Sequence, residues 1–256
     1  MNGLRNTLLA TGLAVLGTTA AQAADLYQPP ILEPLPVEEE FGGGWYLRGY
    51  LGMSNQQVDE LDNVLIDSTP SYEEVHSSFD SAPFGGGAIG YKANDWLRGD
   101  ISAEYRGRAN YHGLGRYNEV FGSGTDEYSA AKSEIVVLAN AFIDMGSWNG
   151  ISPYIGAGIG GSYNTIHAFQ DVNTPNLGVA FGDDDSQWEL AYAFYAGVGF
   201  QVTQNLTMDL GYRYINLGDA QSGDLETYTG VNTVDNPMVF KDLTSHDVML
   251  GFRYAM

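Results

Sequence analysis

The sequence predicts an all-β protein, an eight-stranded antiparallel transmembrane β-barrel with a disordered N-terminal arm. Three observations predict this fold class. The chain begins with an export signal, its later segments alternate between apolar and charged residues, and the connections between those segments alternate between long and short. Alternation with period two is typical of a strand whose two faces meet different surroundings.

Residues 1–23 have the pattern of a signal peptide. Arg5 supplies an early positive charge, residues 8–16 are mostly apolar, and the segment ends in Ala21-Gln22-Ala23. This order of charge, apolar run and small residues is typical of a secretory signal, and we expect cleavage after Ala23. The apolar run is about half the length, roughly 18 residues, that a membrane-spanning helix needs.

Residues 24–43 are predicted to form a periplasmic arm rich in proline and glutamate. The segment reads ADLYQPPILEPLPVEEEFGG, and Glu38, Glu39 and Glu40 follow its prolines. Proline-rich chains are extended, at roughly 3.1 Å per residue, so this arm could reach about 60 Å. The remaining residues, 44–256, are predicted to form the barrel.

Composition narrows the class of protein further. The chain has 33 glycines, 17 tyrosines and no cysteine, and its net charge is −21. Such an acidic chain has too few cations to neutralise phosphates, which argues against a nucleic-acid partner. The absence of thiols means that an oxidising compartment would present no pairing problem.

Segment 97–106 is the clearest strand. Its odd positions are Leu, Gly, Ile, Ala and Tyr, whereas its even positions are Arg, Asp, Ser, Glu and Arg. In a barrel the apolar face would meet lipid and the charged face would line the lumen. The same reading gives eight predicted strands, at residues 45–53, 84–92, 97–106, 134–144, 153–163, 190–202, 206–214 and 247–256.

The connections between these strands predict the topology. Residues 55–83, 107–132, 164–187 and 217–245 form long connections, whereas residues 93–95, 146–152 and 203–205 form short ones. Long loops on one side and tight turns on the other are typical of outer-membrane barrels, in which both termini are periplasmic and the long loops are extracellular. Most of the acidic residues fall in these loops.

Charged residues on the lumen-facing parity form the main candidate site. A barrel of eight strands is barely wide enough for side chains, so opposite charges inside it would pair. We favour a structural charge network, with a narrow conducting path as the alternative. The predicted members are Arg48, Arg98, Asp100, Glu104, Arg106, Glu134, Asp144, Asp209, Arg213, Asp247 and Arg253.

Four stretches resemble a known family: the signal ending in AQA, then ADLYQPP, then GGGWYLRGYLG, and the last strand DVMLGFRYAM. They are similar to the porin-like surface-antigen family of small outer-membrane proteins, which is related to opacity proteins and to the membrane domain of the OmpA type. The resemblance spans essentially the whole mature chain and implies the outer membrane of a Gram-negative bacterium. It also implies two sites.

The first implied site is an assembly signal that the barrel-assembly machinery reads in the last strand, at Gly251, Phe252, Tyr254 and Met256. Met256 departs from the family pattern, which usually ends in phenylalanine. The second is an Ala-Asp N-terminus joined covalently to peptidoglycan, which Ala24 and Asp25 match if cleavage follows Ala23.

The function predicted from the sequence is structural, namely support of envelope integrity, with a peptidoglycan tether through the mature N-terminus. Two alternatives stay open: a small cation-preferring porin, and a surface adhesin or antigen acting through the long acidic loops. Expected partners are outer-membrane lipids and lipopolysaccharide, bridged to the acidic loops by divalent cations.

Motifs for catalysis or cofactors are weak. Gly156, Gly158 and Gly160 resemble part of a dinucleotide loop but continue as a strand, so close packing is the better reading. The acidic triplet Asp183, Asp184 and Asp185 is a weak candidate for calcium, without the spacing of a known calcium loop. Ser245 and His246 lack an acid to complete a hydrolytic site. We therefore expect no enzyme and no cofactor.

Overall fold

The computed structural model describes residues 44–119, 122–228 and 234–256. The predicted signal peptide and N-terminal arm lie outside these residues. The described residues contain one short helix, α1 (Val64–Asp67), and no helix among them is long and apolar enough to cross a membrane.

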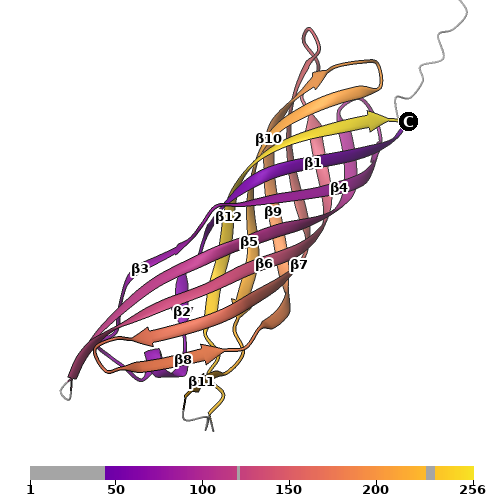
Figure 1. Ribbon diagram of the computed structural model, residues 1–256. Helices are drawn as coiled ribbons and strands as arrows, with labels where there is room; N and C mark the ends of the chain where they lie inside the picture. The colour runs from indigo at the N-terminus through magenta and orange to yellow at the C-terminus, as the bar shows by residue number, and fades with distance from the viewer. Residues whose placement is uncertain (1–43, 120–121, 229–233) are drawn as a thin grey trace, which may run out of the picture. The chain divides into compact units, whose positions relative to one another are not determined.

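Eight antiparallel strands form a closed ring, which confirms the predicted fold class (Figure 1). Each strand pairs with its neighbour along the chain, and pairing between the first and last strands closes the ring. The ring strands are β1 (Gly44–Gln57), β4 (Ala82–Lys92), β5 (Leu97–Glu119), β6 (Gly122–Asp144), β7 (Ile151–Asn173), β9 (Asp185–Gln201), β10 (Leu206–Gln221) and β12 (Val239–Ala255).

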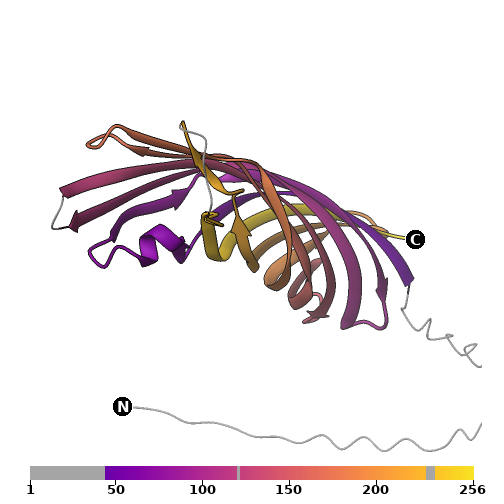
Figure 2. The same cartoon turned by 90° about the horizontal axis from the view of Figure 1, so that it is seen from below.

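Small elements cluster at one end of the ring, which we call the long-hairpin end; the opposite end is the short-turn end. They are β2 (Glu60–Asp62), α1, β3 (Glu73–Phe79), β8 (Gly178–Gly182) and β11 (Leu225–Thr227). Strand β2 pairs with β12, β3 with β5, β8 with β7, and β11 with β8. Figure 2 shows α1 at the end of the barrel away from the C-terminus.

The strands are much longer at the long-hairpin end than the sequence predicts. Strands β5, β6 and β7 each have 23 residues, so the predicted loops at 107–132 and 164–187 are mostly strand, and that part of the prediction is wrong. Within the membrane the apolar residues of a strand face outward, toward lipid. Beyond the membrane the apolar residues face the interior instead: in β6, Ile135 and Val137 are exposed, whereas Tyr128 and Ala130 are buried. No single apolar row therefore marks the whole strand.

The outward face carries an apolar band next to the short-turn end. In β1, for example, Trp45, Leu47, Leu51 and Met53 are all about half exposed or more, while Tyr46 between them is buried. The same band crosses β6 and β7 from residues 135 to 163. Nine residues of a tilted strand span a bilayer core, so we take this band as the membrane-spanning part.

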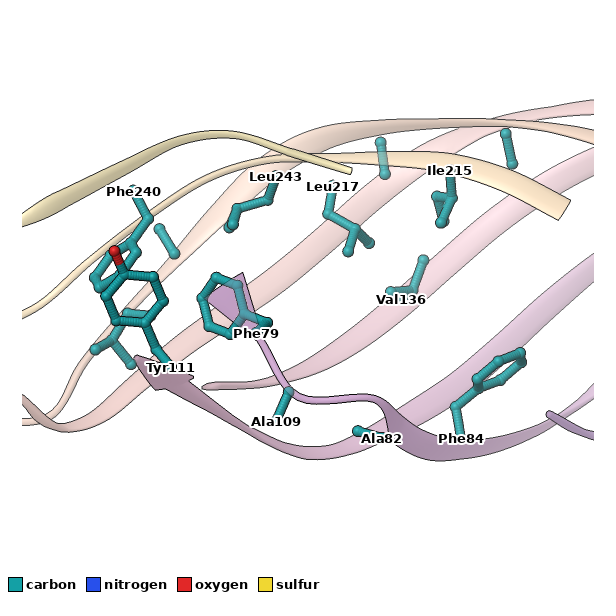
Figure 3. Packing of buried hydrophobic residues seen from close by; sticks show 14 of the residues in the cluster. Phe79, Ala82, Phe84, Ala109, Tyr111, Val136, Ile215, Leu217, Phe240 and Leu243 are labelled. Carbon is teal, nitrogen blue, oxygen red and sulfur yellow. The ribbon is translucent and has the colours of Figure 1, made fainter. Parts of the chain in front are cut away.

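Apolar side chains fill the interior above this band (Figure 3). Phe79, Tyr111 and Phe240 pack with ring centroids 5.0 to 5.9 Å apart, and Leu217 and Leu243 are fully buried beside them. We call these five residues the apolar plug. Together with its neighbours in the buried cluster it gives the long-hairpin half of the barrel a hydrophobic core like that of a soluble protein.

Candidate functional site

The interior of the membrane-spanning part holds equal numbers of positive and negative side chains. Six cations and six anions lie there, and nearly all of them are buried. Because these charges cancel, the net charge of −21 lies outside the lumen. The members are Arg48, Arg98, Arg106, Lys132, Arg213 and Arg253 with Asp100, Glu104, Glu134, Asp144, Asp209 and Asp247. We call them the lumen network.

Two ion pairs lie nearest the short-turn end. Arg98 Nε donates to Asp144 Oδ1 over 3.1 Å, and Arg253 Nη2 lies 3.3 Å from Asp209 Oδ1. Arg253 also approaches Asp144, at 3.9 Å, and so connects the two pairs. These side chains come from four strands, and their pairing links opposite sides of the ring.

The next layer is built around Asp100. Its carboxylate accepts two hydrogen bonds of 3.1 Å from Arg48, through Nε and Nη2. Tyr46 donates a third over 3.1 Å, and Asn140 Nδ2 a fourth over 2.7 Å. Tyr195 donates in turn to Asn140 Oδ1 over 2.9 Å. The buried carboxylate is thus fully hydrogen-bonded, as burial of a charge requires.

The third layer is a square of alternating charge. Arg213 contacts Glu104 at 2.6 Å and Asp247 at 2.7 Å, while Arg106 contacts the same two acids at 3.2 and 2.8 Å. Tyr50 completes it by donating to Glu104 Oε2 over 2.9 Å. Two arginines facing two acids satisfy each other, and the exposed fraction of each side chain is 2% or less.

The fourth layer contains a lysine that the sequence analysis missed. Lys132 Nζ lies 2.5 Å from Glu134 Oε1, both side chains are fully buried, and Arg106 approaches the same glutamate at 3.5 Å. The predicted loop 107–132 includes Lys132, whereas in the structure β6 continues through it and gives it the same parity as Glu134, two residues on in the strand. That parity was the signal that could have found it.

The arginines of the lumen network contact aromatic rings in addition to their acidic partners. The guanidinium of Arg98 lies 4.1 Å from the ring centroid of Phe142, and those of Arg106 and Arg213 each lie 4.9 Å from that of Phe84. These cation–π contacts occupy space between the layers. The sequence analysis also missed Phe84, Phe142 and the buried tyrosines that donate to the network. The sequence has many aromatic residues on the lipid-facing parity, so those on the lumen-facing parity do not stand out.

The network and the apolar plug separate two cavities at opposite ends of the barrel. One, of about 810 Å³, opens at the short-turn end and includes Arg98, Asp144 and Arg253 in its wall. The other, of about 370 Å³, lies at the long-hairpin end beyond the plug. The two walls share no residue. The buried side chains of the lumen network and the apolar plug lie between the two cavities.

The residues of the predicted assembly signal point to both sides of β12. Phe252 and Tyr254 are about half exposed on the apolar band, whereas Gly251 faces inward, where an added Cβ would meet Gly49 O and Tyr50 Cβ at 3.2 Å. Met256 follows the strand and is exposed. Recognition of this pattern stays a prediction. Ala24 and Asp25 lie outside the described residues.

The acidic triplet does not converge on a common point. Asp184 binds His167 Nδ1 at 2.7 Å and accepts from the Ala168 backbone at 2.9 Å, while Asp185 accepts from Gln221 at 2.7 Å. The hydrogen bond from His167 holds the pKa of Asp184 below its ordinary value. Among the described residues no three His, Cys, Asp or Glu side chains are grouped as metal ligands, which leaves the weak calcium candidate, with Asp183, without support.

A serine, a histidine and an acid do meet, although not at Ser245 and His246. Those two point to opposite faces of β12: Ser245 is buried against Asp247, and His246 contacts Tyr212 outside. On the outer face, Ser133 Oγ lies 3.0 Å from the Nε2 of His167, whose Nδ1 binds Asp184.

This series of hydrogen bonds, from Ser133 through His167 to Asp184, has the order of a hydrolytic triad, but the serine is buried and the acid is exposed. Ser133 is only 8% exposed, whereas the side chain of Asp184 is 60% exposed. A hydrolase needs an accessible nucleophile and a sheltered acid, which is the reverse. We therefore interpret these hydrogen bonds as part of the packing of β6, β7 and β9.

The glycines at 156, 158 and 160 lie within β7, where side chains of β6 occupy the space beside them. A Cβ on Gly156 would come within 2.4 Å of the Phe142 ring, and a Cβ on Gly160 within 2.0 Å of Val137 O. Close packing inside a barrel, not cofactor binding, accounts for these glycines.

A closed eight-stranded ring with an outward apolar band and a filled, charge-balanced lumen defines a small outer-membrane β-barrel. Comparison with known proteins leads to the same class. The chain belongs to the family described as "Outer membrane protein beta-barrel domain", which matches residues 11–254. The predicted family resemblance is thereby confirmed.

Individual relatives are similar over most of their length. An uncharacterized protein of Brucella abortus is 32% identical over 277 residues, covering 94% of both chains. Outer membrane protein PagN of Salmonella typhimurium is 28% identical over 235 residues, covering 83% of this chain and 90% of PagN. Among solved structures, outer membrane protease OmpT of Escherichia coli covers 84% of this chain and 96% of its own, with 10% identity and a TM-score of 0.52. The likeness to OmpT concerns the fold alone.

Proposed function

We propose that this protein is a structural, non-conducting barrel that supports the integrity of the outer membrane. The observation that carries the proposal is the filled lumen, in which four layers of paired charges are followed by an apolar plug. A pore needs a continuous row of water along its axis, and the interior of an eight-stranded ring is narrow enough for side chains to fill. The porin alternative would require these layers to separate.

Two measurements test this proposal. Purified barrel in planar bilayers should give no steady conductance in potassium chloride, and a strain lacking the protein should become more sensitive to detergent. Reproducible channels of uniform size, with selectivity for cations, would favour the porin instead. A strain whose detergent resistance is unchanged by the deletion would contradict the structural role.

The proposed orientation places the short turns and both ends of the ring in the periplasm and the long hairpins outside. It follows from the general arrangement of outer-membrane barrels. In this orientation the chain before Gly44 emerges beside the cell wall, where Ala24 and Asp25 could be joined to peptidoglycan. Mass spectrometry of peptides from digested sacculi should find the N-terminal Ala24 peptide with a muropeptide attached, and its absence would end the tether proposal.

The outward surface of the long-hairpin end is strongly acidic, as expected from the charge balance of the lumen. We propose that divalent cations bridge it to lipopolysaccharide, because two anionic surfaces otherwise repel each other. Chelation should then lower the melting temperature of the barrel in lipopolysaccharide-containing membranes. Equal melting temperatures with and without chelator would contradict the bridge.

A second candidate function is surface interaction, as an adhesin or antigen. It is favoured by the continuation of β5, β6 and β7 roughly ten residues beyond the apolar band, with β3 and β8 paired alongside. Such an ordered projection presents a fixed surface to a partner. Shortening the β5–β6 hairpin at the paired residues Arg116 and Thr125, beyond the apolar plug, should abolish surface binding while leaving the ring intact.

A further inference from the structure

The cavity at the long-hairpin end has features that the structural role does not use. Its volume of about 370 Å³ is in the range of small-molecule sites. Its wall is contributed by the ends of β5, β6 and β7, by β8 and β11, and by residues in and next to α1. Because paired strands hold most of this wall, the cavity is part of the folded extension.

The described wall contains two acids and no basic residue. Asp126 and Asp171 belong to it, and Lys, Arg and His are absent from its lining. Asp126 Oδ1 accepts a 2.7 Å hydrogen bond from Asn173 Nδ2. Asp171 Oδ1, in contrast, is buried and has no hydrogen-bond partner in the described part of the chain. A buried carboxylate oxygen without a donor is costly, and a positive charge placed beside the carboxylate in the cavity would offset part of that cost.

The electrostatics of the acid pair agree with this geometry. Burial, and then the neighbouring charge of Asp126, raise the pKa of Asp171 to about 7. Burial also raises the pKa of Asp126. Both shifts mean that the cavity lacks a positive charge that would stabilise the two ionised carboxylates.

Three tyrosines complete the wall. Tyr72, Tyr117 and Tyr128 all line the cavity. The position of Tyr117 is fixed by Asn173, whose Nδ2 donates to its hydroxyl over 2.8 Å. Aromatic faces next to carboxylates favour organic cations, whose positive charge is attracted to the ring and to the acid together. An anion would meet repulsion from both carboxylates.

We propose that this cavity is a binding site for a small organic cation bearing a primary ammonium group, held by Asp171 and Asp126 and enclosed by the three tyrosines. The ammonium group lies between the carboxylates of Asp171 and Asp126, and the hydrocarbon part lies against the rings. This site goes beyond the proposed structural function and does not depend on it.

The test uses the full mature chain in detergent micelles, with 1,4-diaminobutane as the probe in calorimetric titration at pH 8. The buffer contains about 0.5 M sodium chloride. At that ionic strength the Debye length is about 4 Å, so the attraction of the diamine to exposed acidic residues is largely screened. The diamine should bind at least tenfold more tightly than 1,4-butanediol, which has the same chain without charge. Succinate, of opposite charge, should not bind.

Two variants locate the site. Asp171→Asn should weaken diamine binding at least tenfold, and Val179→Trp, which fills the cavity without changing its charge, should abolish it. The matched control is Asp95→Asn, which removes an exposed acid at the short-turn end and should bind as the native protein does. A heat-modifiable shift in gel mobility verifies that each variant has folded.

Three results would overturn the proposal. The first is equal binding by Asp171→Asn and the native chain. The second is equal weakening by Asp95→Asn, which would mean that the diamine binds the acidic surface in general. The third is no heat of binding at millimolar concentrations of diamine.

Discussion

The pair of Arg48 and Asp100 offers a direct measure of how the lumen network is held together. The two side chains approach to 2.9 Å, and Arg48 makes two hydrogen bonds to the carboxylate. Arg48→Met removes the guanidinium and leaves the acid with only Tyr46 and Asn140 as donors. Removing one partner of a buried pair costs about 3–5 kcal/mol, and we expect this range for Arg48→Met.

The matched variants are Asp100→Asn and the double variant. Asp100→Asn leaves the arginine unpaired and should be similarly costly, whereas the double variant removes both charges and keeps an amide for Tyr46 and Asn140 to contact. The coupling energy should therefore be about 2 kcal/mol or more, with the double variant more stable than the sum of the single losses. Urea unfolding of the barrel in lipid vesicles, followed by tryptophan fluorescence, measures all four proteins. Additive losses would refute the idea that the pair acts as a unit.

Three further predictions concern other parts of the barrel. The folded protein holds the proton of Asp171 more tightly than the unfolded chain, because its pKa is raised to about 7, so ionisation weakens the fold as pH rises from about 4 to above 7. Asp171→Asn should thus stabilise the long-hairpin extension by up to about 4 kcal/mol at pH 8 and by less at pH 5, as measured by hydrogen exchange; equal gains at both values would contradict this. Gly160→Ala places a Cβ 2.0 Å from a backbone oxygen of β6 and should block barrel folding in the gel-shift assay, whereas Gly49→Ala has nothing within 4 Å and should fold normally. Leu210→Arg puts a charge on the apolar band and should cost about 2–4 kcal/mol in vesicles, while Asn110→Arg, beyond the band, should cost little.

The membrane-spanning half of the fold could be predicted from the sequence because lipid imposes a simple rule there. Each strand must show apolar residues to the bilayer and can place polar ones inside, so Leu97 to Arg106 separates completely by parity. The short turns followed from the same pattern, and the structure has β5 starting at Leu97 and β6 ending at Asp144. The same rule selected the charged residues that lie inside the ring.

The long-hairpin half could not be predicted in this way because water replaces lipid on the outside and the apolar side chains lie in the interior, which reverses the pattern of the membrane-spanning part. Lys132 is an example: it was assigned to a loop, but the strand continues past it and buries it against Glu134. Phe79, Tyr111 and Phe240 meet from three strands far apart in the sequence, and no local pattern places them together. Asp126 and Asp171 likewise line one cavity only because β6 and β7 pair in register beyond the membrane.

The sequence by itself therefore determined the number of strands in the ring, their order and which face of each meets lipid, since these depend on period-two alternation along single segments. Only the tertiary structure decided which charges pair across the ring, because a lumen partner sits on another strand at a height set by strand tilt and register. The tertiary structure also decided that the interior is filled, since charge balance among Arg106, Arg213, Glu104 and Asp247 arises only where four side chains converge.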